Sequence, residues 1–460
     1  MGGWDGDGDG DWGSARLTAR ADNSPRGGFH PGFRVRFGAG FFSRDRAMKM
    51  AMTMTRERYH ALRALGLKLD LTRGQPGDDN FDLSNAMLTI VDDKSLVTPS
   101  GVSLRNYPGG IAGLKEAREL FAPVLGVEPS EIIVGNNASL SLLGQVLMWA
   151  MLRGVPGSMA PWCKGEAKVI VTVPGYDRHF LMLERLGFTM VPVGMNSDGP
   201  DIAAIEQLVA SDASVKGLLC VPTYSNPTGD TTSQAVADRL GRMQTAAPDF
   251  TIFADDAYAV HHLDGTPPVH PDLLGAAKKA GNPTRVILFG STSKITFAGA
   301  GVSFLAGSKE TVGWIGELMG TQMITPNKVE QYRHVLFLGR YPGGIGGIMK
   351  AHAKLLAPKF AVVDEVLSRE LGGKNLARWT KPKGGYFISL DIEKPVASQV
   401  VRLAKEAGVA LTPAGATYPF GKDPNDRNIR ISPTRPPVDQ VRKAMEVVAV
   451  CVQMASSTEG

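Results

Sequence analysis

The chain has 460 residues, of which 43% are hydrophobic, 21% charged and 7% aromatic. This composition excludes a wholly disordered, collagen-like or fibrous chain, and the length favours two or three domains. The formal net charge of +5 is small for such a length and comes without a dense basic block, so a dedicated nucleic-acid surface is not indicated.

Cysteine usage and hydropathy indicate the compartment. Cys163, Cys220 and Cys451 are far apart, odd in number and without a CxxC pairing. They argue against a disulfide framework or a structural zinc site, and they fit a reducing compartment. The longest apolar stretch, residues 140–152, is too short to span a bilayer. We therefore expect a soluble cytoplasmic protein with no bound metal, no membrane contact and no nucleic-acid partner.

Residues 1–54 differ from the rest of the chain. They are rich in glycine and lack sustained periodicity, which predicts a disordered extension. The acidic run over residues 5–10 opens like a calcium loop, but Arg16 stands where such a loop requires glutamate. A solvated acidic tail is the better interpretation.

From about Arg56 the pattern is a helix, then a strand or loop over 67–77, then an alternation of amphipathic helices and short apolar runs. The strand candidates are short, rich in branched residues and followed by polar or glycine residues: 131–135, 167–174, 216–222, 250–256 and 285–291. This alternation predicts an α/β fold with a mostly parallel sheet covered by helices on both faces. After about residue 345, long helical patterns and a hairpin-like segment over 384–392 predict a smaller α+β domain.

Polar side chains follow the ends of these strands, which is where ligands bind in parallel α/β sheets. They supply a helix start suited to phosphate, an aromatic ring with an imidazole, an asparagine, an Asp/Tyr pair and a lysine: Ala138, Ser139, Tyr176, His179, Asn226, Asp255, Tyr258, Ser291 and Lys294. Each alone has an ordinary structural explanation, such as a turn, a helix cap or a surface lysine. Together they fit a pyridine aldehyde phosphate joined to a lysine as a Schiff base.

The spaced motifs Asn226-Pro-Thr-Gly, Asp255-x-x-Tyr258 and Ser291-x-Ser-Lys294 resemble those of fold-type I pyridoxal-phosphate enzymes of the class I aminotransferase group. Within that group the chain is most similar to bacterial aspartate aminotransferases of the actinobacterial kind. The resemblance implies pyridoxal 5′-phosphate as cofactor and a fold-type I transferase fold. The organisation it implies is an extension over 1–54, an N-terminal segment joining the small domain over 55–100, a large cofactor-binding domain over 101–345 and a C-terminal small domain over 346–455.

The resemblance also implies the catalytic residues. Lys294 would join the cofactor and then move the substrate proton, since an amine can do both. Asp255 would face the pyridine nitrogen and keep it protonated, while Tyr258 and Asn226 would hydrogen-bond the ring oxygen.

Further cofactor contacts follow from the same resemblance. Tyr176 would stack on the ring and His179 would support Asp255 from behind. The phosphate would be held by Ala138, Ser139 and Ser291. Relatives often carry a phosphate-binding arginine after the lysine, but residues 295–303 contain no cation, and Ser303 is a candidate donor in its place.

Two segments resemble parts of the family that bind across subunits or hold substrate. Tyr107, after Asn106, resembles the tyrosine that reaches the neighbouring subunit's phosphate, which implies a homodimer with shared active sites. Arg430 resembles the arginine that clamps the substrate α-carboxylate, a role that a bidentate guanidinium suits. Gly74 lies in a segment resembling the loop that closes over the substrate, and Asn226 would also contact it.

The resemblance implies transfer from L-aspartate to 2-oxoglutarate, giving oxaloacetate and L-glutamate. A dicarboxylate needs a second cation, and the candidates are Lys328, Arg333, Arg105, Arg178 and Arg435. Lys328 lies in the loop region where relatives place substrate-contacting residues from the second subunit. An aromatic or broad-range aminotransferase and a lyase of the same fold stay open as alternatives. A fused DNA-binding regulator is not expected, because residues 1–54 are too short and aperiodic for such a module.

Overall fold

The computed structural model describes residues 44–264 and 268–457. The chain divides into two compact units, Met1–Met48 and Lys49–Gly460, and the second carries the architecture described below. Helix α1 (Arg44–Ala64) begins at Arg44, so residues 44–54, predicted to belong to a disordered extension, are helical instead. The rest of that predicted extension, including the acidic run and Arg16, lies outside the described residues.

The largest sheet has eight strands in the order β2-β9-β8-β7-β6-β3-β4-β5. Neighbours among β3, β4, β6, β7 and β8 are parallel, whereas β9 and β5 run antiparallel to the strands beside them. The mostly parallel sheet and the five predicted strands are therefore confirmed. The strands are β2 (Ile132–Val134), β3 (Lys168–Val173), β4 (Thr189–Asn196), β5 (Gly199–Pro200), β6 (Val215–Cys220), β7 (Thr251–Asp255), β8 (Val286–Ser291) and β9 (Ser303–Ala306).

Helices cover both faces of this sheet, as predicted. Alternate side chains of each strand point to opposite faces, so Ile252 packs with helices of one face and Phe253 with helices of the other. The first group is α6 (Ile202–Ser211), α7 (Gln234–Arg242) and α8 (Leu273–Lys279), and the second is α4 (Ser139–Arg153), α5 (Asp177–Arg185) and α9 (Lys309–Gly320). The other helices of the chain after α1 are α2 (Asp78–Asp82), α3 (Lys115–Phe121), α10 (Lys328–Arg340), α11 (Gly344–Leu371), α12 (Ala397–Glu406) and α13 (Val438–Ser457).

Two smaller sheets are built from C-terminal strands and one early strand. One is antiparallel and has the order β10-β11-β13, with β10 (Ala377–Trp379), β11 (Ile388–Ile392) and β13 (Asn428–Ile431). The other pairs β1 (Leu69–Leu71) with β12 (Val409–Leu411) in parallel, so the early segment predicted as strand or loop forms a strand. A separate hydrophobic core surrounds these strands, α12 and α13.

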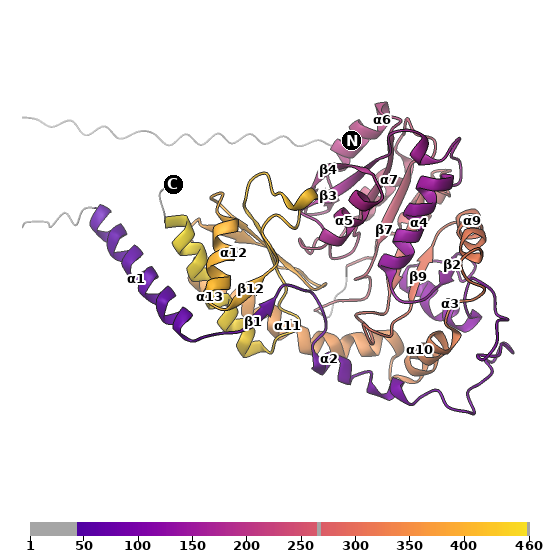
Figure 1. Ribbon diagram of the computed structural model, residues 1–460, viewed down its shortest axis with the longest axis horizontal. Coiled ribbons are helices and arrows are strands. Elements are labelled where there is room, and N and C mark those ends of the chain that lie inside the picture. Colours follow the sequence, from indigo (N-terminus) through magenta and orange to yellow (C-terminus); the bar gives the residue numbers. More distant parts are fainter. Residues whose placement is uncertain (1–43, 265–267, 458–460) are drawn as a thin grey trace, which may run out of the picture. The chain divides into compact units, whose positions relative to one another are not determined.

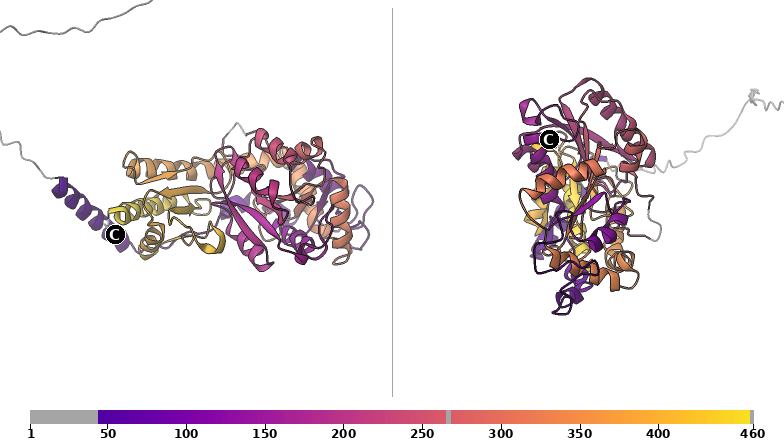
Figure 2. Two further views of the ribbon diagram at one scale, coloured as in Figure 1. Left: turned by 90° about the horizontal axis from the view of Figure 1, so that it is seen from above. Right: turned by 90° about the vertical axis from the view of Figure 1, so that its right-hand side faces the viewer.

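Helix α11 joins the two cores (Figure 1). Ile348 and Met349 pack in the core of the large sheet, whereas residues 360–371 pack in the C-terminal core, and Pro358 lies between them inside the helix. Helix α13 lies along the second half of α11 (Figure 2). The predicted domain boundary after residue 345 thus falls at the start of α11, a helix that contributes to both cores. The division of the chain into a large and a small domain stays a prediction.

The segment over 55–100 also belongs to both cores. Tyr59 and Leu71 pack in the C-terminal core, while Met87 packs in the core of the large sheet. The segment expected to join the small domain therefore also contributes to the core of the large sheet, and its domain assignment stays a prediction. Within the described ranges, no helix is both long enough and apolar enough to cross a membrane.

Candidate active site

Two adjoining cavities lie where the parallel strands end. The inner cavity, of about 160 Å³, is lined by eight of the predicted residues: Ala138, Ser139, Tyr176, Asn226, Asp255, Tyr258, Ser291 and Lys294. The outer cavity, of about 540 Å³, is lined by Arg430, Gly74 and residues around them. Tyr176, Tyr258 and Lys294 line both, so the lysine lies where the two cavities meet.

The Asp255 carboxylate is buried at the end of β7 and has one unsatisfied oxygen. Its Oδ2 accepts a hydrogen bond from His179 Nε2 at 2.9 Å, and His179 is itself buried on α5. Its Oδ1 is buried without a partner among the described residues. An orphaned carboxylate oxygen is destabilising unless a donor reaches it. A protonated pyridine nitrogen is such a donor, so the residues present fit the predicted cofactor. The hydrogen bond from His179 is the contact that its predicted supporting role requires, and that role stays a prediction.

Lys294 has the properties of a reactive amine. Its Nζ lies 5.0 Å from the centre of the Tyr258 ring. Burial lowers the pKa of the Lys294 ammonium, while the negative charge of Asp255 acts in the opposite direction. A lowered pKa enlarges the fraction of neutral amine, which is the form that attacks a carbonyl. The main chain of Lys294 is held in place because its carbonyl accepts hydrogen bonds from His261 Nε2 at 3.3 Å and Tyr386 Oη at 3.4 Å.

The two tyrosines of the inner cavity are kept protonated. Burial, followed by the charge of Asp255, raises the pKa of Tyr176 to about 12. Burial also raises the pKa of Tyr258 well above its ordinary value. Both hydroxyls are therefore hydrogen-bond donors at neutral pH, which suits the predicted contact between Tyr258 and an oxygen on the cofactor ring.

One end of the inner cavity is suited to a phosphate. Ala138 is the N-cap of α4 and supplies no side-chain cap, which leaves backbone N–H groups of the first turn available. Ser139, Ser291 and Ser293 add hydroxyls, and Ser293 was not among the predicted site residues. Of the described residues that line this cavity, only Lys294 has a cationic side chain. A phosphate bound at this end would therefore meet a helix N-terminus and hydroxyls, and no arginine of the described residues lines the cavity.

Ser303 does not replace that arginine. Its side chain is buried on β9, and its hydroxyl donates to the main-chain carbonyl of Asn136. It is also not among the residues that line the inner cavity. The expectation failed because the segment after Lys294 leads directly into β9, whose side chains pack inside the protein.

Arg430 lies on β13 with its guanidinium in the outer cavity. Its Nη1 donates to Asp177 Oδ1 at 2.8 Å and to Asn226 Oδ1 at 3.4 Å. Its guanidinium carbon lies 5.0 Å from the centre of the Phe387 ring, and its Nε is buried without a partner. The unsatisfied Nε leaves this arginine able to bind a carboxylate. Asp177 was missed by the sequence analysis, although it directly follows Tyr176.

Gly74 is required by close packing. A Cβ built on this residue would lie 2.3 Å from Phe387 Cζ, far inside van der Waals contact. The backbone of the predicted substrate loop therefore packs directly against the ring that supports Arg430. Glycine has no Cβ, so this approach is possible only with glycine at this position.

Of the five cations considered for a second carboxylate, only Arg178 lines the outer cavity. Arg333 pairs with Glu330 at 2.7 Å, Arg435 lies 3.9 Å from Asp70, and neither they nor Arg105 line this cavity. Arg73, beside Gly74, also lines it and was not predicted. Neither Arg73 nor Arg178 has a hydrogen bond or ion pair to the side chain of another described residue.

Lys328 and Tyr107 lie outside both cavities of this chain. The Lys328 ammonium is buried and donates to main-chain carbonyls, and it does not line the outer cavity of its own chain, which leaves only the predicted contact with a substrate in the second subunit. The Tyr107 side chain is 65% exposed. Its predicted contact with a neighbouring subunit stays a prediction.

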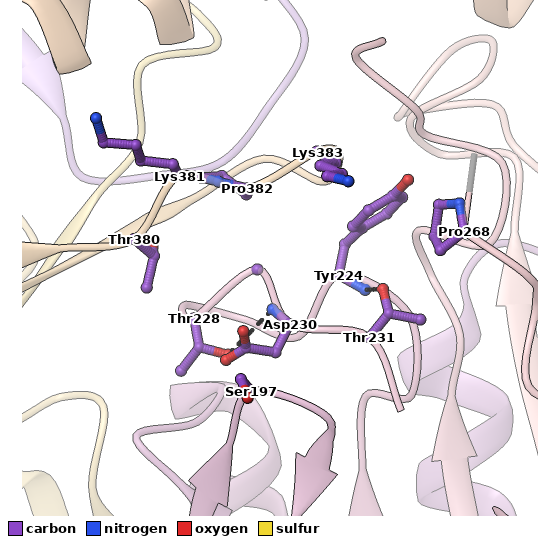
Figure 3. A pocket seen from close by; sticks show the side chains of 11 residues that line it. Ser197, Tyr224, Thr228, Asp230, Thr231, Pro268, Thr380, Lys381, Pro382 and Lys383 are labelled. Carbon is purple, nitrogen blue, oxygen red and sulfur yellow. Dashed lines mark hydrogen bonds between the residues drawn. The ribbon is translucent and has the colours of Figure 1, made fainter. Parts of the chain in front are cut away.

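A third cavity, of about 270 Å³, lies between the loop over 228–231 and residues 380–383 (Figure 3). Neither Lys294 nor Arg430 lines it. Lys381 at its edge pairs with Asp364 at 2.8 Å. This cavity therefore contains none of the predicted reactive groups.

Comparison with known proteins relates these features to a family. A family model described as "Aspartate amino-transferase" matches residues 43–459. An "Aspartate aminotransferase" from Corynebacterium glutamicum is 45% identical over 403 residues, which cover 87% of this chain and 93% of that protein. A "Putative aminotransferase" from Mycolicibacterium smegmatis is 47% identical over 402 residues, covering 87% and 94%. The crystal structure of an aspartate transaminase from Corynebacterium glutamicum superposes with a TM-score of 0.87 at 43% identity, covering 90% of this chain and 97% of that one.

Proposed function

Because the chain belongs to the aspartate aminotransferase family, and is thus a fold-type I aminotransferase, we propose that it moves the amino group of L-aspartate to 2-oxoglutarate, giving oxaloacetate and L-glutamate. Pyridoxal 5′-phosphate is the cofactor that this family implies. When bound, it supplies an electron sink for the charge that develops at the substrate Cα.

The residues of the inner cavity have separate tasks in this proposal. Asp255 keeps a positive charge on the ring nitrogen, and His179 fixes the orientation of the carboxylate. Tyr258 and Asn226 would donate hydrogen bonds to the ring oxygen. Lys294 would remove the proton from Cα of the donor amino acid and deliver a proton to the corresponding carbon of the acceptor 2-oxo acid, and its lowered pKa favours the neutral amine that accepts a proton.

The observation that carries the choice of substrate is the charge of the outer cavity. Arg73, Arg178 and Arg430 line it, against the single carboxylate of Asp177. Arg430 would hold the α-carboxylate and orient the Cα–H bond toward Lys294. An unpaired guanidinium, that of Arg178, is then available for the distal carboxylate of a dicarboxylic substrate. An aromatic amino acid would leave this cation without a partner.

The absorbance of the cofactor-loaded protein tests this proposal. L-aspartate, added without a keto acid, should change the absorbance of the bound cofactor, and 2-oxoglutarate should restore it. L-phenylalanine should act far more slowly. A faster reaction with L-phenylalanine would favour a broad-range or aromatic enzyme, and no response to either amino acid would refute both.

A matched pair of variants tests the role of Arg178. Loss of a charge-assisted hydrogen bond is worth about 1.5–3 kcal/mol, so Arg178→Gln should lower kcat/KM for L-aspartate by roughly 10- to 100-fold. Arg185→Gln, an exposed change on the same helix α5, should leave it unchanged. Equal behaviour of the two variants would remove Arg178 from substrate binding.

A homodimer with shared active sites and a cytoplasmic location complete the proposal. The exposed Tyr107 supports the first, and free cysteines, of which Cys163 is exposed, support the second. Mixing Lys294→Ala with Tyr107→Phe protein tests the dimer. If sites are shared, a mixed dimer keeps one site with both native residues, so activity should exceed that of either variant alone.

A further inference from the structure

The side chain of Lys328 is buried beneath the loop that carries Tyr107. Lys328 is the first residue of α10 and is only 4% exposed. Its ammonium donates to the main-chain carbonyl of Ser103 at 2.7 Å and to those of Asn106 and Pro108. These three carbonyls belong to one segment, residues 103–108, which we term the Tyr107 loop.

The number of donors excludes a second role for this lysine. An ammonium group has three N–H donors and no acceptor. Three carbonyls of the Tyr107 loop occupy all of them, so none is left for a substrate carboxylate. The stem of the side chain is also enclosed, because a Cβ built on Gly109 would lie 3.1 Å from Lys328 Cδ.

A cation is an unusual choice at this position. The N-terminus of a helix carries a partial positive charge, which disfavours lysine in the first turn. Burial acts in the same direction and lowers the pKa of the Lys328 ammonium. A charge retained against both effects needs strong compensation, and the carbonyls of the Tyr107 loop supply it.

The Tyr107 loop is attached at its start by Leu104, whose side chain packs in the core of the large sheet, and has few other attachments. Leu104 donates to the carbonyl of Leu96 at 2.9 Å before the loop turns, and the carbonyl of Ala112 accepts from Val134 at 3.0 Å after it. The main-chain carbonyls of residues 105–111 accept few hydrogen bonds. Among the described residues, Lys328 is the only donor from another segment that reaches them.

The helix that carries Lys328 is fixed beside the phosphate end of the inner cavity. The main-chain N–H of Asn327 donates to Asn136 Oδ1 at 2.8 Å, and Gln331 Nε2 donates to the carbonyl of Val134 at 2.8 Å. Asn136 lies two residues before Ala138, the N-cap of α4. Lys328 therefore connects the Tyr107 loop to the segment that opens the phosphate site.

We propose that Lys328 is a positioning residue, which holds the Tyr107 loop so that the Tyr107 hydroxyl reaches the cofactor phosphate of a second copy of this chain. This role rests on the shared active sites of the proposed function. It assigns Lys328 to cofactor retention and removes it from substrate selection.

A double-mutant cycle on cofactor affinity tests the proposal. Lys328→Met keeps the stem and removes the ammonium, and Tyr107→Phe removes only the hydroxyl. Each should raise the dissociation constant of pyridoxal 5′-phosphate about tenfold, the size expected for one lost hydrogen bond to a charged group. The double variant should be no weaker than the single ones, because both changes remove the same contact. Lys115→Met, an exposed change on α3, should have no effect.

Hydrogen exchange supplies a second measurement. Amides over residues 105–110 should exchange faster in Lys328→Met than in the native dimer. Should this variant fail to fold, Lys328→Gln, which keeps two N–H donors, replaces it. Native affinity in Lys328→Met with weakened affinity in Tyr107→Phe would overturn the role of Lys328 alone. Native affinity in Tyr107→Phe would overturn the shared site and the positioning role together. Additive losses in the double variant would also refute the proposal.

Discussion

The substitution Gly74→Ala gives a direct test of how the predicted substrate loop and the carboxylate clamp are linked. The new Cβ would lie 2.3 Å from Phe387 Cζ, whereas carbon atoms in contact are about 3.5–4.0 Å apart. Phe387 or the loop must therefore move by roughly 1 Å or more. Since the Phe387 ring lies beneath the Arg430 guanidinium, this movement displaces the group that would hold the substrate α-carboxylate.

Overpacking of this kind costs about 1–3 kcal/mol. If the loop relieves it by staying open, the whole amount appears in substrate binding, and KM for L-aspartate should rise by roughly 5- to 150-fold with little change in cofactor affinity. Steady-state kinetics together with a cofactor titration measures both quantities. Gly165→Ala is the control, because a Cβ there meets nothing within 4 Å. In the double variant Gly74→Ala/Phe387→Leu, the smaller leucine side chain should restore part of the affinity for L-aspartate. An unchanged KM in Gly74→Ala would refute the reasoning.

Two further predictions concern the inner cavity. His179→Phe removes the one described hydrogen bond to the Asp255 carboxylate. The dissociation constant of the cofactor, measured by absorbance titration, should rise roughly 10-fold or more. Unchanged cofactor affinity would contradict the supporting role of His179. Burial lowers the pKa of Lys294 from 10.5, so the neutral amine becomes populated as the pH rises through a value below 10.5. The initial rate of cofactor uptake by the apoprotein, plotted against pH, should therefore have its midpoint below 10.5. In Asp255→Asn the midpoint should move lower still, because the carboxylate raises this pKa, and a midpoint at or above 10.5 in the native apoprotein would contradict the burial argument.

The strand ends and the site residues that follow them could be predicted because short stretches of sequence contain the information. Each of the five strands is a short apolar run, and the polar residues that follow it meet at one edge of the sheet by the rule for parallel strands. Eight of the predicted cofactor residues therefore line one cavity, and His179 lies directly behind Asp255.

The side-chain partners of the other site residues could not be predicted, because they lie in distant segments of the chain. Arg430 pairs with Asp177, which lies 253 residues away, and no local pattern indicates that pair. Lys328 was assigned to substrate from its position in the chain, whereas its partners are carbonyls more than 200 residues earlier. Ser303 was judged by its hydroxyl, but the short strand β9 buries that hydroxyl between β2 and β8. Arg73 could have been predicted to line the outer cavity, because it directly precedes Gly74 in the predicted substrate loop.

The shared helix α11 has a mechanical consequence. Its first turns pack in the core of the large sheet, whose strand β8 ends three residues before Lys294, and its last turns pack against the core that includes β13, the strand of Arg430. Proline cannot donate the main-chain hydrogen bond of a helix, so Pro358 leaves the carbonyl of Lys354 without its helical partner. The helix should therefore bend most easily near this point. A bend there would change the distance between the guanidinium of Arg430, on β13, and the amine of Lys294, because each is attached to a different end of α11.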